Sequence, residues 1–334
     1  MRFYDSANSP KGWDTYERLV EALFAYVGEL LKPTESSTIT RDFYRGTLRF
    51  LLLLHHDFPE FLIENHFRLA SVAPVEGVQL RNLVISAYPS NFPELPDPFT
   101  AGLKVDRLEE VRQTPTVRGD FEGLLRDAGI KGLIDNLLQT PEQNGEDVGK
   151  ICRAMDLVDT TEDRVSVNML LVNALVLYIG NSAVADAGNK APIFNSGSTA
   201  AHLLEKLAKE LHPEVRYHLI GAMVNQLRWP NSHTHYFQYA IIHWFSLSSS
   251  DQVVVEVQQQ ITRVLLERLL VHRPHPWGLI VTLLEILKDP SYQFWDLPFV
   301  KAAPEVIIDL CTNLPSNLFE RYESAVSKDD VVMQ

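Results

Sequence analysis

Apolar residues recur along most of this 334-residue chain with the spacing of one face of an α-helix. The clearest stripe lies in residues 16–31 and follows the i, i+3, i+4, i+7 rule: Tyr16, Leu19, Val20, Leu23, Phe24, Val27, Leu30 and Leu31. Pro33 follows at once and predicts the end of this helix, because proline lacks the backbone N–H that a helix needs. A helix with one apolar face must bury that face, so the pattern predicts helices packed against one another.

The same spacing predicts further helices in both halves of the chain. In the first half they cover residues 42–55, 59–70 and 80–88; in the second they cover 165–185, 198–211, 213–227, 233–247, 251–269, 277–287 and 304–314. Ser198 and either Ser250 or Asp251 stand where a side chain can cap the helix that follows. Pro213 and Pro304 suit the first turn of a helix.

Two stretches do not show this spacing. Residues 91–100 contain three prolines and predict a loop, and residues 100–146 predict short helices and turns. Strand patterns are scarce, and no strict sequence repeat occurs. We therefore predict an all-α fold, a HEAT-like α-solenoid or irregular array of antiparallel helical pairs, forming a single domain over residues 1–318. Residues 319–334 read as a disordered acidic tail.

Composition and charge narrow the classes of function. The chain is 46% hydrophobic, which is ample for a large core, and its net charge of −13 disfavours direct binding of nucleic acid. It has two cysteines, Cys152 and Cys311, too few for a disulfide framework, so a reducing compartment fits best. No apolar run opens the chain, so we expect no signal peptide. We expect a monomer in isolation.

Residues 165–185 are long enough and free enough of charge to be tested as a membrane span. Six polar or glycine residues interrupt them: Ser166, Asn168, Asn173, Gly180, Asn181 and Ser182. Polar amides are costly in hydrocarbon, so we interpret the segment as a central helix of a soluble core.

Motifs of enzymes and metal sites are missing from the sequence. It contains no phosphate-binding glycine loop, no nucleophile elbow and no zinc-protease motif. His233 and His235 are the best metal candidates, but residues two apart on a helix face different ways, and we favour a capping or hydrogen-bonding role. Cys152 and Cys311 read as small buried apolar residues. We therefore expect no enzyme activity, no cofactor and no metal.

Three stretches carry a recognisable pattern. They contain LRNLVISAYPSNFPELPDPFTAGLKVD at 80–106, LLVNALVLYIGNSAVA at 170–185, and, between residues 225 and 304, NQLRWPNSHTHY, QITRVLLERLLVHRPHPWGLIVTLLEILK and FWDLPFVKAAPE. Together they resemble the C-terminal domain of Not-one, the large non-catalytic scaffold subunit of the CCR–NOT deadenylase complex. The resemblance runs from about Trp13 to Leu314, and RPHPWG and RWPNSHTHY are its most specific segments.

The resemblance implies a stack of HEAT-like helical pairs that docks other proteins. The implied partners are the Not-two and Not-three/five subunits as a heterodimer, and short peptides such as the tail of the Not-four ubiquitin ligase or Nanos-like repressors. It implies a role in messenger-RNA deadenylation, decay, transcription regulation and translational repression, in the cytoplasm and also the nucleus. The resemblance assigns no contact residues.

Two other classes of function stay open on the sequence alone. One is an unrelated α-solenoid, such as an adaptor or transport receptor, and the other is a helical enzyme whose site matches no motif. The candidate partner-binding residues are four aromatic side chains within eight residues, Tyr292, Phe294, Trp295 and Phe299. Exposed aromatic clusters anchor partners, whereas buried ones would close the end of the helical stack and fix the last helix.

Overall fold

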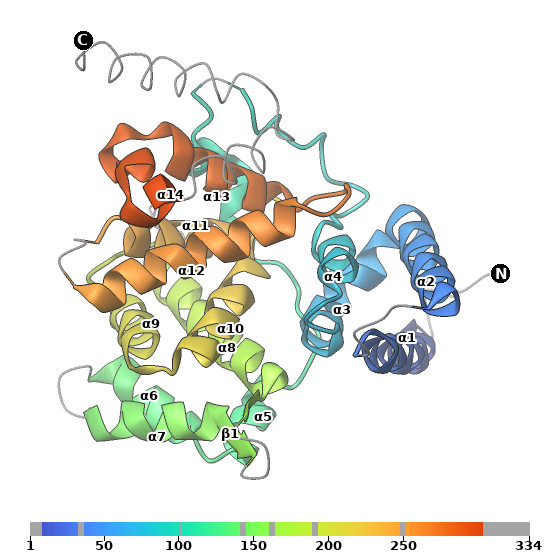
Figure 1. Ribbon diagram of the computed structural model, residues 1–334, viewed down its shortest axis with the longest axis horizontal. Helices are drawn as coiled ribbons and strands as arrows, with labels where there is room; N and C mark the ends of the chain where they lie inside the picture. Colours follow the sequence, from blue (N-terminus) through green and yellow to red (C-terminus); the bar gives the residue numbers. More distant parts are fainter. Residues whose placement is uncertain are drawn as a thin grey trace.

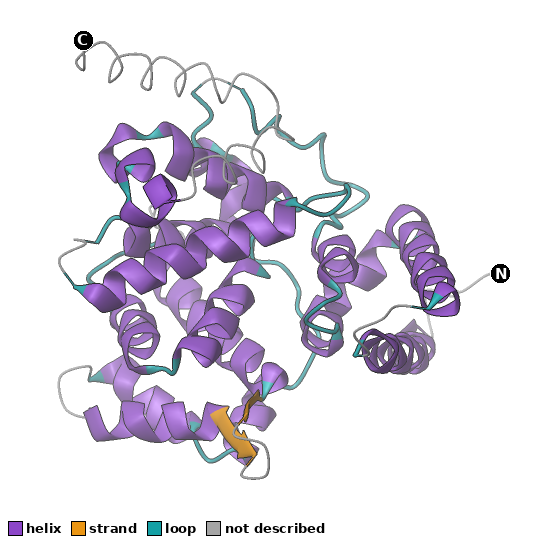
Figure 2. Ribbon diagram, in the orientation of Figure 1, coloured by secondary structure: helices purple, strands orange, loops and turns teal. Residues whose placement is uncertain are grey.

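The structure is a computed structural model, and it describes residues 9–32, 37–100, 102–140, 145–159, 164–188, 193–247 and 251–302. Helices dominate these residues, with one short hairpin of two strands (Figure 2). The α-helices are α1 (Ser9–Leu31), α2 (Thr38–Asp57), α3 (Pro59–Val72), α4 (Val78–Ile85), α5 (Phe121–Asp127), α6 (Lys131–Gln139), α7 (Gly145–Met155), α8 (Met169–Ala187), α9 (Thr199–Glu210), α10 (Pro213–Val224), α11 (Ser232–Phe245), α12 (Gln252–Leu269), α13 (Trp277–Lys288) and α14 (Pro298–Ala302). Four short 3-10 helices join them: η1 (Val105–Arg107), η2 (Glu109–Arg112), η3 (Pro290–Tyr292) and η4 (Phe294–Asp296). The all-α prediction is confirmed.

Local signals in the sequence place most helix ends correctly. α1 ends at Leu31, two residues before Pro33, and α10 begins at Pro213. The Ser198 hydroxyl accepts a hydrogen bond from the Ala201 N–H at 3.2 Å and caps α9. The Asp251 carboxylate does the same at the start of α12. These caps satisfy backbone N–H groups that have no partner inside the helix.

Several local features differ from the sequence prediction: α2 begins at Thr38 rather than at residue 42, and α4 ends at Ile85 rather than at residue 88. The helix expected from residue 165 begins at Met169, because the Asn168 side chain accepts from the Leu171 N–H at 3.1 Å and caps it there. The residues before it form an antiparallel hairpin of β1 (Asp156–Asp159) and β2 (Arg164–Val167). Helix α7 was not predicted. The helix predicted at 304–314 and the tail predicted at 319–334 lie outside the described residues.

Helix α8 lies at the centre of the fold. It contacts α3, α5, α9, α10 and α11, which approach it from several sides (Figure 1). It is the one helix in the described ranges that is long and apolar enough to cross a membrane, and 61% of its apolar window is buried. Burial against five other helices is the behaviour expected of a core helix.

Successive helices pack against one another along the chain, and several also contact the helix after the next. Thus α1 contacts α2 and α3, and α10 contacts α11 and α12. This is the arrangement of stacked helical pairs. In Figure 1 helices α1–α4 form a group at one side, and α5–α14 form a larger body beside it.

Each of these two groups has its own apolar core, and each core contains a residue from the other group. Phe67 of α3 lies in the large core around α8, whereas Trp229, from the turn between α10 and α11, lies in the core of α1–α4. Phe67 is 2% exposed and Trp229 is 6% exposed. The two cores are therefore locked together by reciprocal insertion. The single domain over residues 1–318 stays a prediction.

Candidate docking surfaces and the junction between the two cores

The two most distinctive sequence segments, residues 228–236 and 273–278, meet at the junction between the cores. The Gly278 N–H donates to the Arg228 carbonyl oxygen at 2.7 Å. A Cβ atom at Gly278 would lie 2.6 Å from the Thr234 Cγ2 atom, so only glycine permits this approach. The neighbouring Trp277 donates its indole N–H to the Pro96 carbonyl at 2.7 Å and ties the proline loop to α13. These segments are therefore structural.

The turn before α11 is held by its own side chains. The Asn231 side chain accepts from the Thr234 N–H at 3.0 Å and caps α11, and it donates to the Trp229 carbonyl at 2.7 Å. The Ser232 N–H donates to the Gln113 carbonyl at 2.9 Å. This last bond fixes the extended segment 113–118, whose far end is held because the Arg118 N–H donates to the Glu64 carbonyl at 2.8 Å.

Arg228 places a cation at the centre of this junction. The side chain is 1% exposed and its central carbon lies 4.4 Å from the centroid of the Trp229 ring. Its Nη1 atom is 3.2 Å from Nδ1 of His66, while its Nε and Nη2 atoms have no hydrogen-bond partner among the described residues. Burial away from any described carboxylate lowers the pKa of Arg228 to about 9.

A second buried polar network crosses the junction and joins α4, α12 and α8 through the C-terminal end of α10. The Asn82 amide of α4 donates to the Arg268 carbonyl of α12 at 2.6 Å, and Arg268 donates to the Asn225 side chain at 2.8 Å. Asn225 in turn donates to the Asn173 side chain of α8 at 3.0 Å. A buried polar group costs stability unless it is hydrogen-bonded, so this chain specifies how α4 sits on the larger body.

The predicted capping or hydrogen-bonding role does not hold for His233, because Asn231 caps α11 instead and neither His233 ring nitrogen has a partner among the described residues. His233 and His235 are both 1% exposed. Burial, with Arg228 nearby, lowers the pKa of His233 to about 3; burial lowers that of His235 to about 4.

Across the described ranges no group of three or more His, Cys, Asp or Glu is placed to hold a metal. Cys152 is buried, as predicted, and Cys311 lies outside these ranges.

The predicted aromatic cluster closes one end of the large core. Phe294 is 2% exposed and stacks on Phe245 of α11 with ring centroids 6.1 Å apart. Tyr292, Trp295 and Phe299 are half-buried and pack against the same core. Their short turns, η3 and η4, agree with the predicted loop or short turn. This geometry makes Phe294 a core residue, and the partner-binding role of the cluster stays a prediction.

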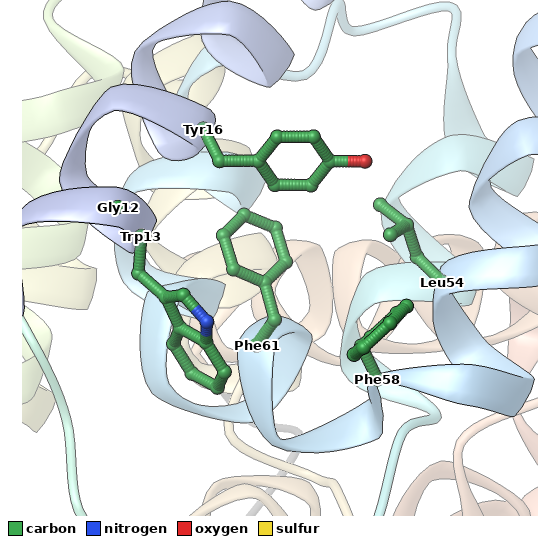
Figure 3. Close-up of a pocket in the computed structure, with 6 residues that line it drawn as sticks. All are labelled: Gly12, Trp13, Tyr16, Leu54, Phe58 and Phe61. Carbon is green, nitrogen blue, oxygen red and sulfur yellow. The ribbon is translucent and has the colours of Figure 1, made fainter. Parts of the chain in front are cut away.

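An apolar slot opens between α1, α2 and α3 (Figure 3). Phe61 forms its centre, with Trp13 and Tyr16 edge-on to the Phe61 ring at centroid distances of 5.5 and 5.1 Å. Its volume is about 60 Å³, and it is lined by Gly12, Trp13, Tyr16, Leu54, Phe58 and Phe61. Exposed apolar side chains lie elsewhere on α1 and α2, among them Leu19, Tyr26, Ile39 and Leu53. This side of the molecule offers apolar area for a partner.

A wider groove lies over the junction itself and has a volume of about 480 Å³. Most of its lining comes from α3, from the proline loop and from the segment 113–118. It is lined by Glu60, Ile63, Glu64, Pro89, Asn91, Phe92, Pro93, Glu110, Gln113, Thr114, Pro115, Thr116, Trp229 and Asn231. Sequence reasoning identified the proline loop but missed the groove, because its walls meet only through the tertiary contacts described above.

Comparison with known proteins identifies the family of this chain. A family model described as "CCR4-Not complex component, Not1" matches residues 4–310. The chain belongs to the Not1 family. The resemblance predicted from its sequence is thereby confirmed.

Curated Not1 proteins match most of the chain. The CCR4-NOT transcription complex subunit let-711 of Caenorhabditis elegans is 35% identical over 308 residues, which cover 90% of this chain and 11% of that protein. General negative regulator of transcription subunit 1 is 34% identical over 263 residues in Schizosaccharomyces pombe and 30% identical over 301 residues in Saccharomyces cerevisiae. These matches cover 79% and 88% of this chain, but 12% and 14% of the two yeast proteins. The chain thus spans a small part of the length of its Not1 relatives.

Solved Not1 structures share the fold. The NOT1 superfamily homology domain from Chaetomium thermophilum superposes with a TM-score of 0.84 at 38% identity, covering 91% of this chain and 60% of that one. A Not1 C-terminal domain solved in complex with Not4 superposes with a TM-score of 0.77 at 30% identity, covering 90% of this chain and 59% of that one. The helical array described here is therefore the fold of Not1 domains.

Proposed function

We propose that this chain is a non-catalytic docking module of the CCR4–NOT complex, which binds partner subunits and so supports messenger-RNA deadenylation, decay and translational repression. Membership of the Not1 family carries the proposal. A related Not1 C-terminal domain has been solved in complex with Not4. Binding of another subunit is the behaviour expected of a docking module. A docking module agrees with membership of the Not1 family, whereas an unrelated adaptor or transport receptor does not.

The proposed partners are the Not-two and Not-three/five subunits, together with short peptides such as the Not-four tail or Nanos-like repressors. The apolar slot, the exposed apolar side chains of α1 and α2, and the groove over the junction support such docking. A rigid helical array presents ridges and grooves that suit extended segments and helices of other proteins. We propose that this docking takes place in the cytoplasm and also the nucleus.

The absence of catalysis is part of the same proposal. Three residues of the kind that catalyse reactions, His233, His235 and Arg228, are buried in the junction, which supports this proposal. The net charge of −13 disfavours RNA as a direct ligand. The chain would act on messenger RNA only through the enzymes of the complex.

Affinity capture from a cytoplasmic extract tests this function. The purified chain is immobilised, and the captured proteins are identified by mass spectrometry. We expect Not subunits of the complex, and we expect their capture to persist after nuclease treatment. Capture of nuclear-transport cargo or a small GTPase, with no Not subunit, would contradict the proposal.

A further inference from the structure

We propose that the groove over the junction binds an extended peptide segment that carries one large apolar residue flanked by lysine or arginine. This inference rests on the proposed docking function, since it names the class of segment that one surface of the module would take. Three features of the groove support it: its fixed walls, the apolar side chains in its lining and the three glutamates that line it.

The walls of the groove suit an extended chain. The proline loop forms one wall, where the Ser90 N–H donates to the Glu60 carboxylate at 3.1 Å. Segment 113–118 forms the other wall and is tied to α11 and α3 through backbone bonds of Gln113 and Arg118. Both walls are therefore fixed before a partner arrives, which lowers the entropy cost of binding. A long groove with preformed walls accommodates an extended segment better than a globular surface.

Apolar and aromatic side chains form part of the lining of the groove. Phe92 is half-buried, and Ile63, Pro93 and Pro115 line the space around it. Trp229, which is 6% exposed, also lines the groove, and Arg228 covers the face of its ring. Such a surface accepts a large apolar side chain, which would supply most of the binding energy.

The rim of the groove carries more negative than positive charge. Glu60, Glu64 and Glu110 all line it. Glu64 lies 3.7 Å from the Arg118 guanidinium, but Glu60 and Glu110 form no ion pair among the described residues. Two half-buried carboxylates without a cation favour an occupant that brings lysine or arginine. The same charge would repel an acidic segment or a nucleic acid.

Fluorescence anisotropy with two labelled synthetic peptides tests the inference. In one, lysine alternates with leucine and proline; in the other, glutamate replaces each lysine. We expect the lysine peptide to bind and the glutamate peptide not to bind. Glu110→Gln should weaken binding about twofold to fivefold, as loss of an exposed charge pair does, and added salt should weaken it further. Phe92→Ala should weaken it by about tenfold or more, since it removes the apolar contact.

Glu109→Gln is the matched control. Glu109 is exposed, belongs to the same short helix η2 and does not line the groove, so the substitution removes the same charge one residue away. It should leave binding unchanged, and both variants should keep the melting temperature of the wild type. Equal weakening by the two substitutions would show a general attraction to an acidic protein and would overturn the inference. Failure of the lysine peptide to bind at all would overturn it too.

A parallel measurement separates this inference from the proposed function. The same variants are tested for capture of the Not-two–Not-three/five heterodimer. Capture by the wild type with no peptide binding refutes the groove and leaves the docking function standing. Peptide binding that depends on Glu110, with no capture of any Not subunit, keeps the groove and refutes the proposed assembly.

Discussion

The guanidinium of Arg228 stacks on the ring of Trp229 at 4.4 Å, and this pair joins the two cores of the molecule. Trp229 is inserted into the core of α1–α4, while the Arg228 carbonyl holds Gly278 at the start of α13. One dipeptide therefore touches both parts of the fold. We expect the buried charge of Arg228 to lower the free energy of unfolding, or leave it unchanged, and the buried ring of Trp229 to raise it.

Replacing Arg228 by methionine should leave the free energy of unfolding unchanged or raise it by about 1–2 kcal/mol. A buried cation without a carboxylate partner pays a desolvation cost that an apolar side chain of similar length avoids. Trp229→Ala should instead lower the free energy of unfolding by about 3–5 kcal/mol, because it leaves a cavity in the α1–α4 core. Urea unfolding of both variants measures this. A large loss in Arg228→Met would show that the charge itself stabilises the junction.

Replacing either of two helix glycines by alanine should change the stability of the protein, but in opposite directions. Gly278→Ala places a Cβ atom 2.6 Å from the Thr234 Cγ2 atom and 3.0 Å from the Leu227 carbonyl carbon, so we expect a loss of about 1–3 kcal/mol from overpacking. Gly221 of α10 has nothing within 4 Å of its Cβ position, so Gly221→Ala should gain about 0.5–1 kcal/mol from helix propensity. Thermal melting of the two single variants tests the prediction. Equal shifts would contradict the close approach at Gly278.

Stability should fall as the pH is lowered below about 6.5. Burial keeps the pKa of His233 near 3 and that of His235 near 4 in the folded chain, whereas unfolded histidine titrates at about 6.5. Between these values the unfolded chain binds protons that the folded chain does not, so acid favours unfolding. Each histidine should contribute a loss of about 2 kcal/mol between about pH 6.5 and about pH 5.

Urea unfolding at several pH values measures this dependence. His233→Gln should reduce its slope, since glutamine does not titrate. His202→Gln, a substitution of an exposed histidine on α9, is the control and should leave the slope as in the wild type. An identical pH dependence in all three proteins would show that His233 does not titrate in this way.

The aromatic cluster should act mainly through stability. Phe294→Ala removes a buried ring that stacks on Phe245 and should cost about 3–5 kcal/mol. Trp295 is half-buried beside Phe294, so Trp295→Ala should cost less than Phe294→Ala. Melting and capture of Not subunits are measured on the same preparations. A Trp295→Ala protein that melts like the wild type but loses capture would make Trp295 a partner contact.

The helices of this fold were predictable, because their signals are local. The apolar stripe of residues 16–31, Pro213 at a first turn, and the caps Ser198 and Asp251 each act within a few residues. The start of α8 was misplaced by four residues because the uncharged run begins inside β2, and nothing in that run except Asn168 marks the boundary. The class of fold followed from these local patterns.

The junction and its groove could not be predicted in the same way. Asn82 meets Arg268 across 186 residues, and Thr114 faces Ser232 across 118. No periodicity carries such pairings. The string RWPNSHTHY was distinctive enough to suggest a resemblance, but its histidines suggested ligands or caps, whereas the structure buries them. The unusual composition of RWPNSHTHY thus marked the segment as important but did not show that it forms the junction between the two cores.

Reconstitution with purified proteins tests the docking function most directly. The chain is mixed with the Not-two–Not-three/five heterodimer, and the mixture is followed by size-exclusion chromatography with light scattering and by isothermal titration calorimetry. The account predicts a single complex with one copy of each subunit and saturable binding without RNA. Separate elution of the chain and the heterodimer, with no heat of binding at concentrations where both proteins are folded, would contradict it.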